Sequence, residues 1–196
     1  IGFDRALIGA YGHDDRVCSY PAFSALFDTE TDGKTVMVVL ADKEEIGSEG
    51  TTGMQCAIFT DLIDAIAYSF DTTSAVIRAN SKCLSADVNA AYDPNFKDVN
   101  EPMNSTYVSC GAGLTKFTGA RGKSGSNDAS AEFMAEVRKM FNDEGVIWQT
   151  GELGKVDQGG GGTVAKYIAK MNIDTVDIGV AVVSMHAPYE VISKAD

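Results

Sequence analysis

The sequence predicts an α/β fold, and three features indicate it. Apolar runs of strand length alternate with segments whose apolar residues recur every three or four positions, a pattern typical of strands alternating with helices. One run, residues 178–185, is almost entirely apolar, as expected of a central strand that is covered on both faces of its sheet. A chain of 196 residues with 44% hydrophobic residues has the size and composition of one globular domain.

In the first part of the chain, apolar spacing predicts helices over residues 16–29 and 52–69. Pro21 lies near the start of the earlier helix, where its missing N–H is tolerated. Between the two helices, residues 35–41 are apolar at all positions after Thr35 and follow a Thr-Asp-Gly turn, which predicts a strand. Further short strands are predicted over residues 75–78, 83–86 and 113–118.

In the second part, residues 128–143 carry an apolar stripe that predicts a helix capped by Asn127 or Asp128. Residues 146–149 predict another strand. The four glycines at 159–162 precede a further short helix. This run offers backbone amides to an anion, or it serves a tight entry into the helix, and the sequence leaves both interpretations open.

The charge balance and the cysteines exclude some classes of protein. Sixteen basic residues against 28 acidic ones give a net charge of −12, which argues against a nucleic-acid-binding protein because such a face needs clustered basic residues. The four cysteines are dispersed and form no CxxC pair, so we expect a reducing, cytoplasmic environment. No apolar run reaches membrane-spanning length, so no membrane partner is expected.

Acidic and imidazole side chains follow several of the predicted strands. Glu44 and Glu45 come directly after an apolar run, Asp87 follows a short strand, and His186 follows the last strand, while Asp14 precedes the first helix. Loops at strand ends are where α/β proteins gather reactive groups, and carboxylates with imidazoles suit zinc, manganese or cobalt. Taken singly, an Asp before a helix is more often an N-cap and a lone His more often structural.

The chain then shows a specific resemblance. Four motifs, in order, resemble those of the M18 family of zinc aminopeptidases, and a further stretch resembles the bacterial members. The motifs occupy residues 9–16, 42–49, 85–87 and 184–188, and the bacterial stretch covers residues 116–128.

The resemblance implies a role for each candidate residue. Asp14 would bridge two Zn²⁺ ions, with Mn²⁺ or Co²⁺ as alternatives. Glu45 and His186 would bind one ion and Asp87 the other. Glu44 would be the general base that takes a proton from the metal-bridging water. These roles imply a metal-dependent aminopeptidase that hydrolyses N-terminal residues from peptides and works as a homo-oligomer; the preferred N-terminal residue stays open.

The resemblance also implies an incomplete fold. It predicts a zinc exopeptidase-like three-layer sandwich with a central mixed, mostly parallel sheet, of which residues 1–196 are the C-terminal part of the catalytic domain. The N-terminal part and the inserted dimerisation domain are absent, and so is the family's His-x-Asp motif. Because His13 and His186 are the only histidines, and relatives carry other residues in place of His13, the site of Asp14 and Asp87 is expected to bind metal weakly. The alternative function is a catalytically incomplete fragment that binds metal or a subunit.

Overall fold

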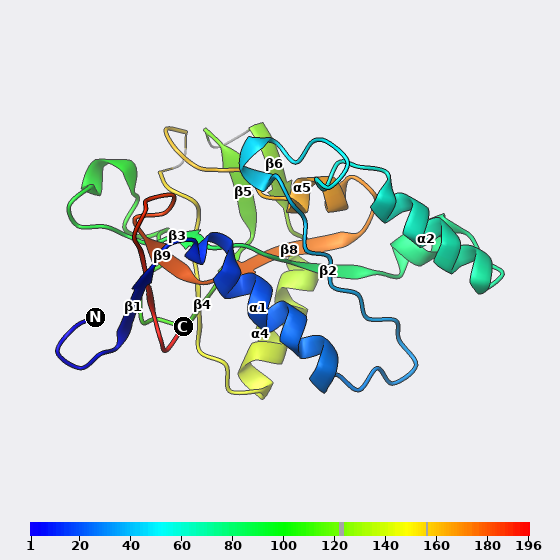
Figure 1. Cartoon of the computed structure of the whole chain (residues 1–196), viewed down its shortest axis with the longest axis horizontal. Coiled ribbons are helices and arrows are strands. Elements are labelled where there is room, and N and C mark those ends of the chain that lie inside the picture. Colours follow the sequence, from blue (N-terminus) through cyan, green and yellow to red (C-terminus); the bar gives the residue numbers. More distant parts are fainter. Residues whose placement is uncertain (122–123, 156) are drawn as a thin grey trace.

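The computed structural model describes residues 1–121, 124–155 and 157–196 and confirms the α/β class (Figure 1). Within these residues the strands form two four-stranded sheets and one two-stranded hairpin. Both larger sheets mix parallel and antiparallel neighbours. The structure thus supports a mixed sheet; in the first of the two, two of the three pairings among the described strands are parallel.

The first sheet has the order β2-β8-β4-β7, so β2 lies at its edge. Strand β8 pairs parallel with β2 and antiparallel with β4, which in turn pairs parallel with β7. The bounds are Lys82–Ala86 for β2, Ala112–Thr115 for β4, Trp148–Thr150 for β7 and Asp174–Gly179 for β8.

The second sheet has the order β1-β10-β9-β3. Only Val180 separates β8 from β9, so one apolar stretch has neighbours on both sides in the two sheets, which confirms the prediction of a central strand there. The bounds are Leu7–Ala10 for β1, Asn89–Ala90 for β3, Ala181–Val183 for β9 and Glu190–Ser193 for β10. The separate hairpin consists of β5 (Phe117–Ala120) and β6 (Ser124–Asp128).

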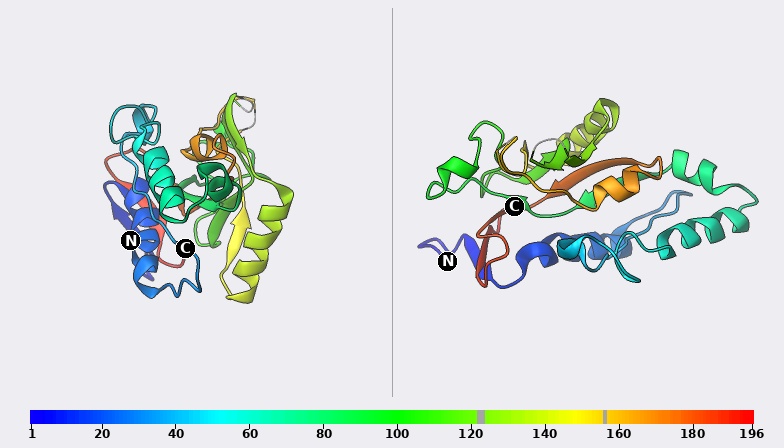
Figure 2. Two further views of the ribbon diagram at one scale, coloured as in Figure 1. Left: turned by 90° about the vertical axis from the view of Figure 1, so that its right-hand side faces the viewer. Right: turned by 90° about the horizontal axis from the view of Figure 1, so that it is seen from above.

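Helices cover the strands from two sides, with α1 and α4 on opposite sides in both views of Figure 2. None of the helices in the described ranges is long and apolar enough to cross a membrane. Their bounds are His13–Asp28 for α1, Ile58–Ser69 for α2, Ser74–Ala79 for α3, Ala131–Asp143 for α4 and Ala165–Ala169 for α5, with one-turn helices at Glu44–Ile46 and Lys97–Val99.

Three apolar clusters hold these layers together. The largest packs Phe133, Val137 and Phe141 of α4 against Leu114 of β4 and Val176 of β8. A second joins α1 to β9 and β10, and a third joins α2 and α5 near the edge strand β2. The α4 stripe predicted from the sequence is therefore the main core contact of that helix.

Two predicted elements are wrong. Residues 35–41 form no strand and residues 75–78 belong to the helix α3. Thr73 caps α3 by accepting the N–H of Val76, which gives this short apolar segment a helical start. The cap of α4 also lies two or three residues later than predicted, because Ser130 accepts the N–H of Phe133. Residues 35–41 form no strand because no described segment lies beside them as a hydrogen-bonded neighbour.

Candidate metal centre

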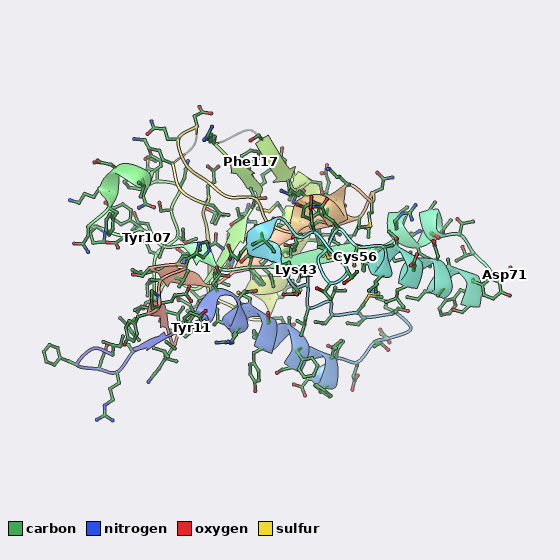
Figure 3. All side chains as sticks on the ribbon, turned by 45° about the horizontal axis from the view of Figure 1, so that its top comes forward. Tyr11, Lys43, Cys56, Asp71, Tyr107 and Phe117 are labelled. Carbon is green, nitrogen blue, oxygen red and sulfur yellow. The ribbon has the colours of Figure 1, made fainter. Side chains whose placement is uncertain are left out.

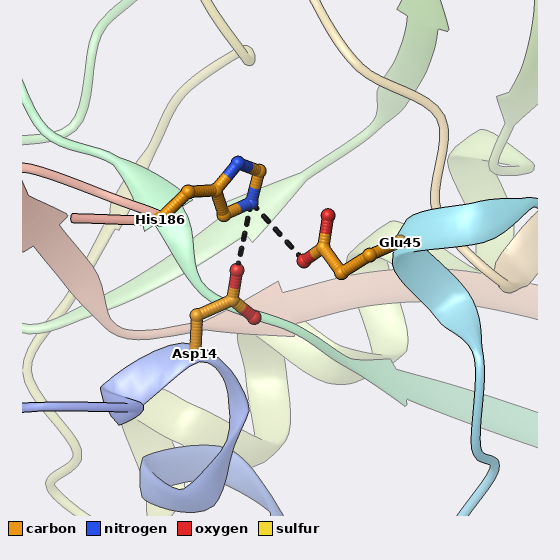
Figure 4. Close-up of side chains that lie close together, drawn as sticks. All are labelled: Asp14, Glu45 and His186. Atoms are coloured by element: carbon orange, nitrogen blue, oxygen red, sulfur yellow. Dashed lines mark ion pairs between the residues drawn. The ribbon is translucent and has the colours of Figure 1, made fainter. Parts of the chain in front are cut away.

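Three side chains from distant parts of the chain meet at one point (Figure 4). The Nε2 atom of His186 lies 3.0 Å from Oδ2 of Asp14 and 3.1 Å from Oε1 of Glu45. One ligand atom from each residue lies within 4.8 Å of the other two. Two carboxylates and one imidazole at this spacing form a donor set that zinc, manganese and cobalt accept.

Irregular backbone brings these side chains to the ends of their elements. Asp14 lies in the opening of α1, where its φ of −79° and ψ of 104° are not helical. Glu45 lies in a one-turn helix that follows Lys43, a residue with a left-handed φ of 64°. Lys43 is labelled near the middle of the molecule in Figure 3. His186 has a φ of 65° in the loop after β9. Such left-handed residues other than glycine are uncommon and often found at functional sites.

Glu190, at the start of β10, holds the backbone of two of the three residues. Its side chain is buried, with only 2% of the residue exposed. Its Oε2 atom accepts the N–H of Asp14 at 2.9 Å, and its Oε1 atom accepts the N–H of His186 at 2.8 Å. Hydrogen bonds to a carboxylate are stronger than neutral ones, so Glu190 fixes the spacing between these two residues.

Asp14 also belongs to a second cluster, with Asp15 and Asp87. Asp87 directly follows β2, and its backbone N–H donates to Ile178 of β8. One carboxylate oxygen of Asp15 accepts the N–H of Cys18 at 3.3 Å, so Asp15 also caps the regular part of α1. The second cluster contains three carboxylates and, among the described residues, no imidazole.

Burial raises the pKa of every carboxyl group in the second cluster. It raises the pKa of Asp14 and of Asp15 to about 6 each, and that of Asp87 to about 8, with repulsion between neighbouring carboxylates as a further cause. Crowded, partly desolvated carboxylates are unfavourable unless a cation or protons compensate them. The donor set therefore fits a divalent cation on chemical grounds.

Glu44 faces the same space without joining either cluster. It is partly buried, and this burial together with the charge of Asp14 raises its pKa, while Lys166 lowers it. One groove of about 1620 Å³ takes in all the acidic and imidazole groups described so far. Its lining includes Asp14, Asp15, Glu44, Glu45, Asp87, His186 and Glu190.

The structure thus brings together all five residues that the sequence singled out. Asp14, Glu45, Asp87 and His186 belong to the two clusters, and Glu44 lines the same groove. Two contributing residues were missed. Asp15 is adjacent to Asp14, and its N-cap role could have been expected; Glu190 is the first residue of the short strand β10 and gave no signal in the sequence. His13 joins neither cluster of the described residues.

Comparisons with known proteins agree with these motifs. The family model for aminopeptidase I zinc metalloproteases (M18) matches residues 1–196. A probable M18 family aminopeptidase 1 from Clostridium acetobutylicum is 48% identical over 199 residues, which cover 100% of this chain and 43% of the relative. The crystal structure of an M18 aminopeptidase from Thermotoga maritima is 46% identical, with a TM-score of 0.94 over 100% of this chain and 44% of that one.

A more distant structure shares the fold. The mApe1 dodecamer of S. cerevisiae is 24% identical, with a TM-score of 0.78 over 100% of this chain and 44% of that one. The chain therefore spans less than half the length of the relatives it matches. Because the family model covers the whole sequence and the identity to bacterial members is high, the chain belongs to the M18 family of zinc aminopeptidases.

Proposed function

We propose that the protein containing this chain is a metal-dependent aminopeptidase that removes N-terminal residues from peptides. The observation that carries the proposal is the meeting of Asp14, Glu45 and His186 within 4.8 Å of one another. Family membership supports zinc as the metal. Asp14, Glu45 and His186 would hold one ion, and Asp14 with Asp87 would hold a second. Bound zinc would supply a Lewis acid and lower the pKa of water to about 7.

Glu44 is the proposed general base. Its raised pKa keeps its carboxylate basic enough to accept a proton from the attacking water. The protonated Glu44 would then donate this proton to the amine that leaves when the peptide bond breaks. Its position on the groove lining, outside both ligand clusters, leaves its carboxylate available for this role.

The groove supports a peptide as the substrate, since it is open and mostly apolar next to the acidic centre. We also propose that residues 1–196 are the C-terminal part of the catalytic domain, with the N-terminal part and an inserted dimerisation domain elsewhere in a longer polypeptide. In that complete domain the sheet would be the mostly parallel centre of a three-layer sandwich. A cytoplasmic homo-oligomer is the assembly we expect from the family.

Replacing Glu44 with Gln in the full-length protein tests the mechanism. Hydrolysis of aminoacyl p-nitroanilides should fall by about a hundredfold to ten-thousandfold, because a general base contributes that much. Zinc content, measured by mass spectrometry, should be unchanged. Glu49→Gln is the matched control, since Glu49 is exposed four residues after Glu45 and loses the same charge.

Two results would contradict the proposal. Full activity of the Glu44→Gln protein would exclude Glu44 as the base. Absence of hydrolysis in the wild-type full-length protein, with zinc bound, would instead favour a fragment that binds metal or a subunit without turnover.

A further inference from the structure

The turn that carries Glu44 and Glu45 contains an unusual number of left-handed residues. Lys43 precedes it with a φ of 64°, and Gly47 and Ser48 follow it with φ values of 99° and 59°. Left-handed residues other than glycine are strained and persist only where their surroundings hold them. The position of this turn therefore depends on contacts with the rest of the molecule.

Backbone hydrogen bonds fix the shape of the turn rather than its place. The N–H of Gly47 donates to the carbonyl of Glu44, and the N–H of Ser48 donates to that of Lys43. The carbonyl of Ser48 accepts the N–H of Gln55, which joins the turn to the loop that follows it. These bonds all lie within one short stretch of chain, so a separate contact must connect the turn to a sheet.

The carbonyl oxygen of Gly47 makes such a contact. It accepts the side-chain amide of Gln55 at 2.7 Å and the hydroxyl of Tyr167, which lies 120 positions further along the chain, at 3.2 Å. The Gln55 amide also donates to the Tyr167 hydroxyl oxygen at 3.3 Å. Both amide hydrogens and the hydroxyl hydrogen thus have acceptors. We call these three groups the Gly47 contact.

The ring of Tyr167 is itself held in place. It packs against the apolar cluster that joins α2 and α5, which includes Ile63 and Ile168. The ammonium group of Lys166 lies 4.9 Å from the centre of the ring, within the range of a cation–π interaction. Because the ring is already fixed on both counts, its hydroxyl loses little further freedom when it bonds to Gly47.

The helix α5, which carries Tyr167, is bonded to the first sheet. The hydroxyl of Thr163 donates to Oδ1 of Asp177 in β8 at 2.6 Å and accepts the N–H of Ala165, at the start of α5, at 3.3 Å. Thr163 and Asp177 are each only 3% exposed. Hydrogen bonds to a carboxylate are stronger than neutral ones. A continuous series of contacts therefore leads from β8 through α5 and Tyr167 to the turn of Glu44 and Glu45.

The metal centre thus depends on two separate supports. Glu190 of the second sheet holds the backbone of Asp14 and His186, whereas the turn with Glu45 is bonded through Tyr167 to a helix on the first sheet. The 3.1 Å between Glu45 and His186 consequently requires both supports. Displacements of about 1 Å in a catalytic site can lower a rate a hundredfold.

We propose that Tyr167, together with Gln55, is a positioning residue that sets the place of Glu44 and Glu45 relative to Asp14 and His186. Neither Tyr167 nor Gln55 belongs to the groove lining or to the two ligand clusters, so they act through the carbonyl of Gly47. The proposal rests on the proposed roles of Glu44 as the base and Glu45 as a ligand.

Variants that remove single hydrogen-bonding groups test the proposal in the full-length protein. Zinc affinity, measured by competition with a chelator, should fall about tenfold in Tyr167→Phe and in Gln55→Met, and about a hundredfold in the double variant. The weakened ion should be the one that His186→Ala also loses. At saturating zinc, kcat should fall about tenfold in Tyr167→Phe while KM stays unchanged, because the substrate does not touch Tyr167.

Two comparisons separate positioning from a purely structural role. Tyr68→Phe is the matched control, because Tyr68 is an exposed tyrosine of α2 outside the groove lining; it should retain wild-type zinc affinity and kcat. Tyr167→Phe keeps the ring on its apolar cluster, so its urea midpoint in EDTA should match that of the wild type. Tyr167→Ala removes the ring and should lower that midpoint.

Two results would overturn the proposal. One is a double variant with the zinc affinity and kcat of the wild type. The other is a Tyr167→Phe protein whose only change is a lower urea midpoint, which would make the hydroxyl purely structural. If the wild-type protein binds zinc without hydrolysing peptides, the proposed function fails, but the zinc affinities still decide the role of Tyr167. If Glu44→Gln is inactive and the double variant behaves as the wild type, the proposed function stands and this proposal fails.

Discussion

Replacing Asp87 with Asn should change how the stability of the metal-free chain depends on pH. Burial, followed by repulsion from Asp15, Glu44 and Asp14, raises the pKa of Asp87 from 3.8 to about 8. Between these two values the folded state holds a proton that the unfolded state releases. The contribution of Asp87 to stability is therefore complete below pH 3.8 and is lost as the pH rises through 8.

The expected magnitude follows from those two pKa values. A difference of one unit between the pKa values of the folded and unfolded states corresponds to about 1.4 kcal/mol. Between pH 5 and pH 7 the metal-free wild type should accordingly lose about 2–3 kcal/mol more of its free energy of unfolding than Asp87→Asn does. Zinc should reverse this trend, because metal binding requires the ionised carboxylate and strengthens as the pH rises.

Urea titrations of residues 1–196 in EDTA at several pH values measure the free energy of unfolding. Asp98→Asn is the matched control, since Asp98 is an exposed aspartate in the one-turn helix Lys97–Val99, and it should follow the wild type at every pH. Parallel pH dependences for the wild type and Asp87→Asn would refute the burial of an acidic group beside Asp14 and Asp15.

The remaining predictions concern the metal, the core and a helix cap. Calorimetric titration of residues 1–196 with zinc should show one tight site that His186→Ala removes, and at most a weak second site; two equally tight sites would contradict the ligand assignment. Zinc at about a hundred times its dissociation constant should add about 2.7 kcal/mol to the free energy of unfolding. Phe133→Ala should cost about 3–5 kcal/mol in a urea titration, because Phe133 is 5% exposed in the α4 cluster, whereas the exposed Met140→Ala should change stability by less than about 0.5 kcal/mol. Ser130→Ala should cost about 1 kcal/mol by removing the bond to the N–H of Phe133, and an unchanged melting temperature would show that this cap is dispensable.

The sequence predicted those helices and strands whose packing or hydrogen-bonding neighbours lie among the described residues. The stripe of α4 found its cluster against β4 and β8, and the apolar run at residues 178–185 became the shared centre of two sheets. Residues 35–41 failed as a strand because a strand exists only with a hydrogen-bonded neighbour, and no described residue supplies one. Residues 75–78 failed because a cap at Thr73 outweighs the β-propensity of a short apolar run.

The residue types of the candidate site and its meeting point were predicted from the expectation that carboxylates and imidazoles gather at strand ends, although Glu44 and Glu45 follow a segment that forms no strand in the described structure. The sequence could not reveal that one carboxylate, that of Glu190, accepts the backbone N–H groups of both Asp14 and His186. The N-cap bond of Asp15 is local and predictable, whereas the contact between Glu190 and Asp14 spans 176 positions. Such a long-range contact leaves no periodic signal in the sequence.

The buried carboxylate of Glu190 makes two distant stretches of chain mechanically dependent on each other. Strand β10 pairs antiparallel with β1, which leads into Asp14, and with β9, which leads into His186. A shift of β10 would therefore displace both residues together and preserve their separation, while Glu45, mounted on a separate turn, would stay behind. Any motion that opens this centre should accordingly begin at the turn of Glu44 and Glu45.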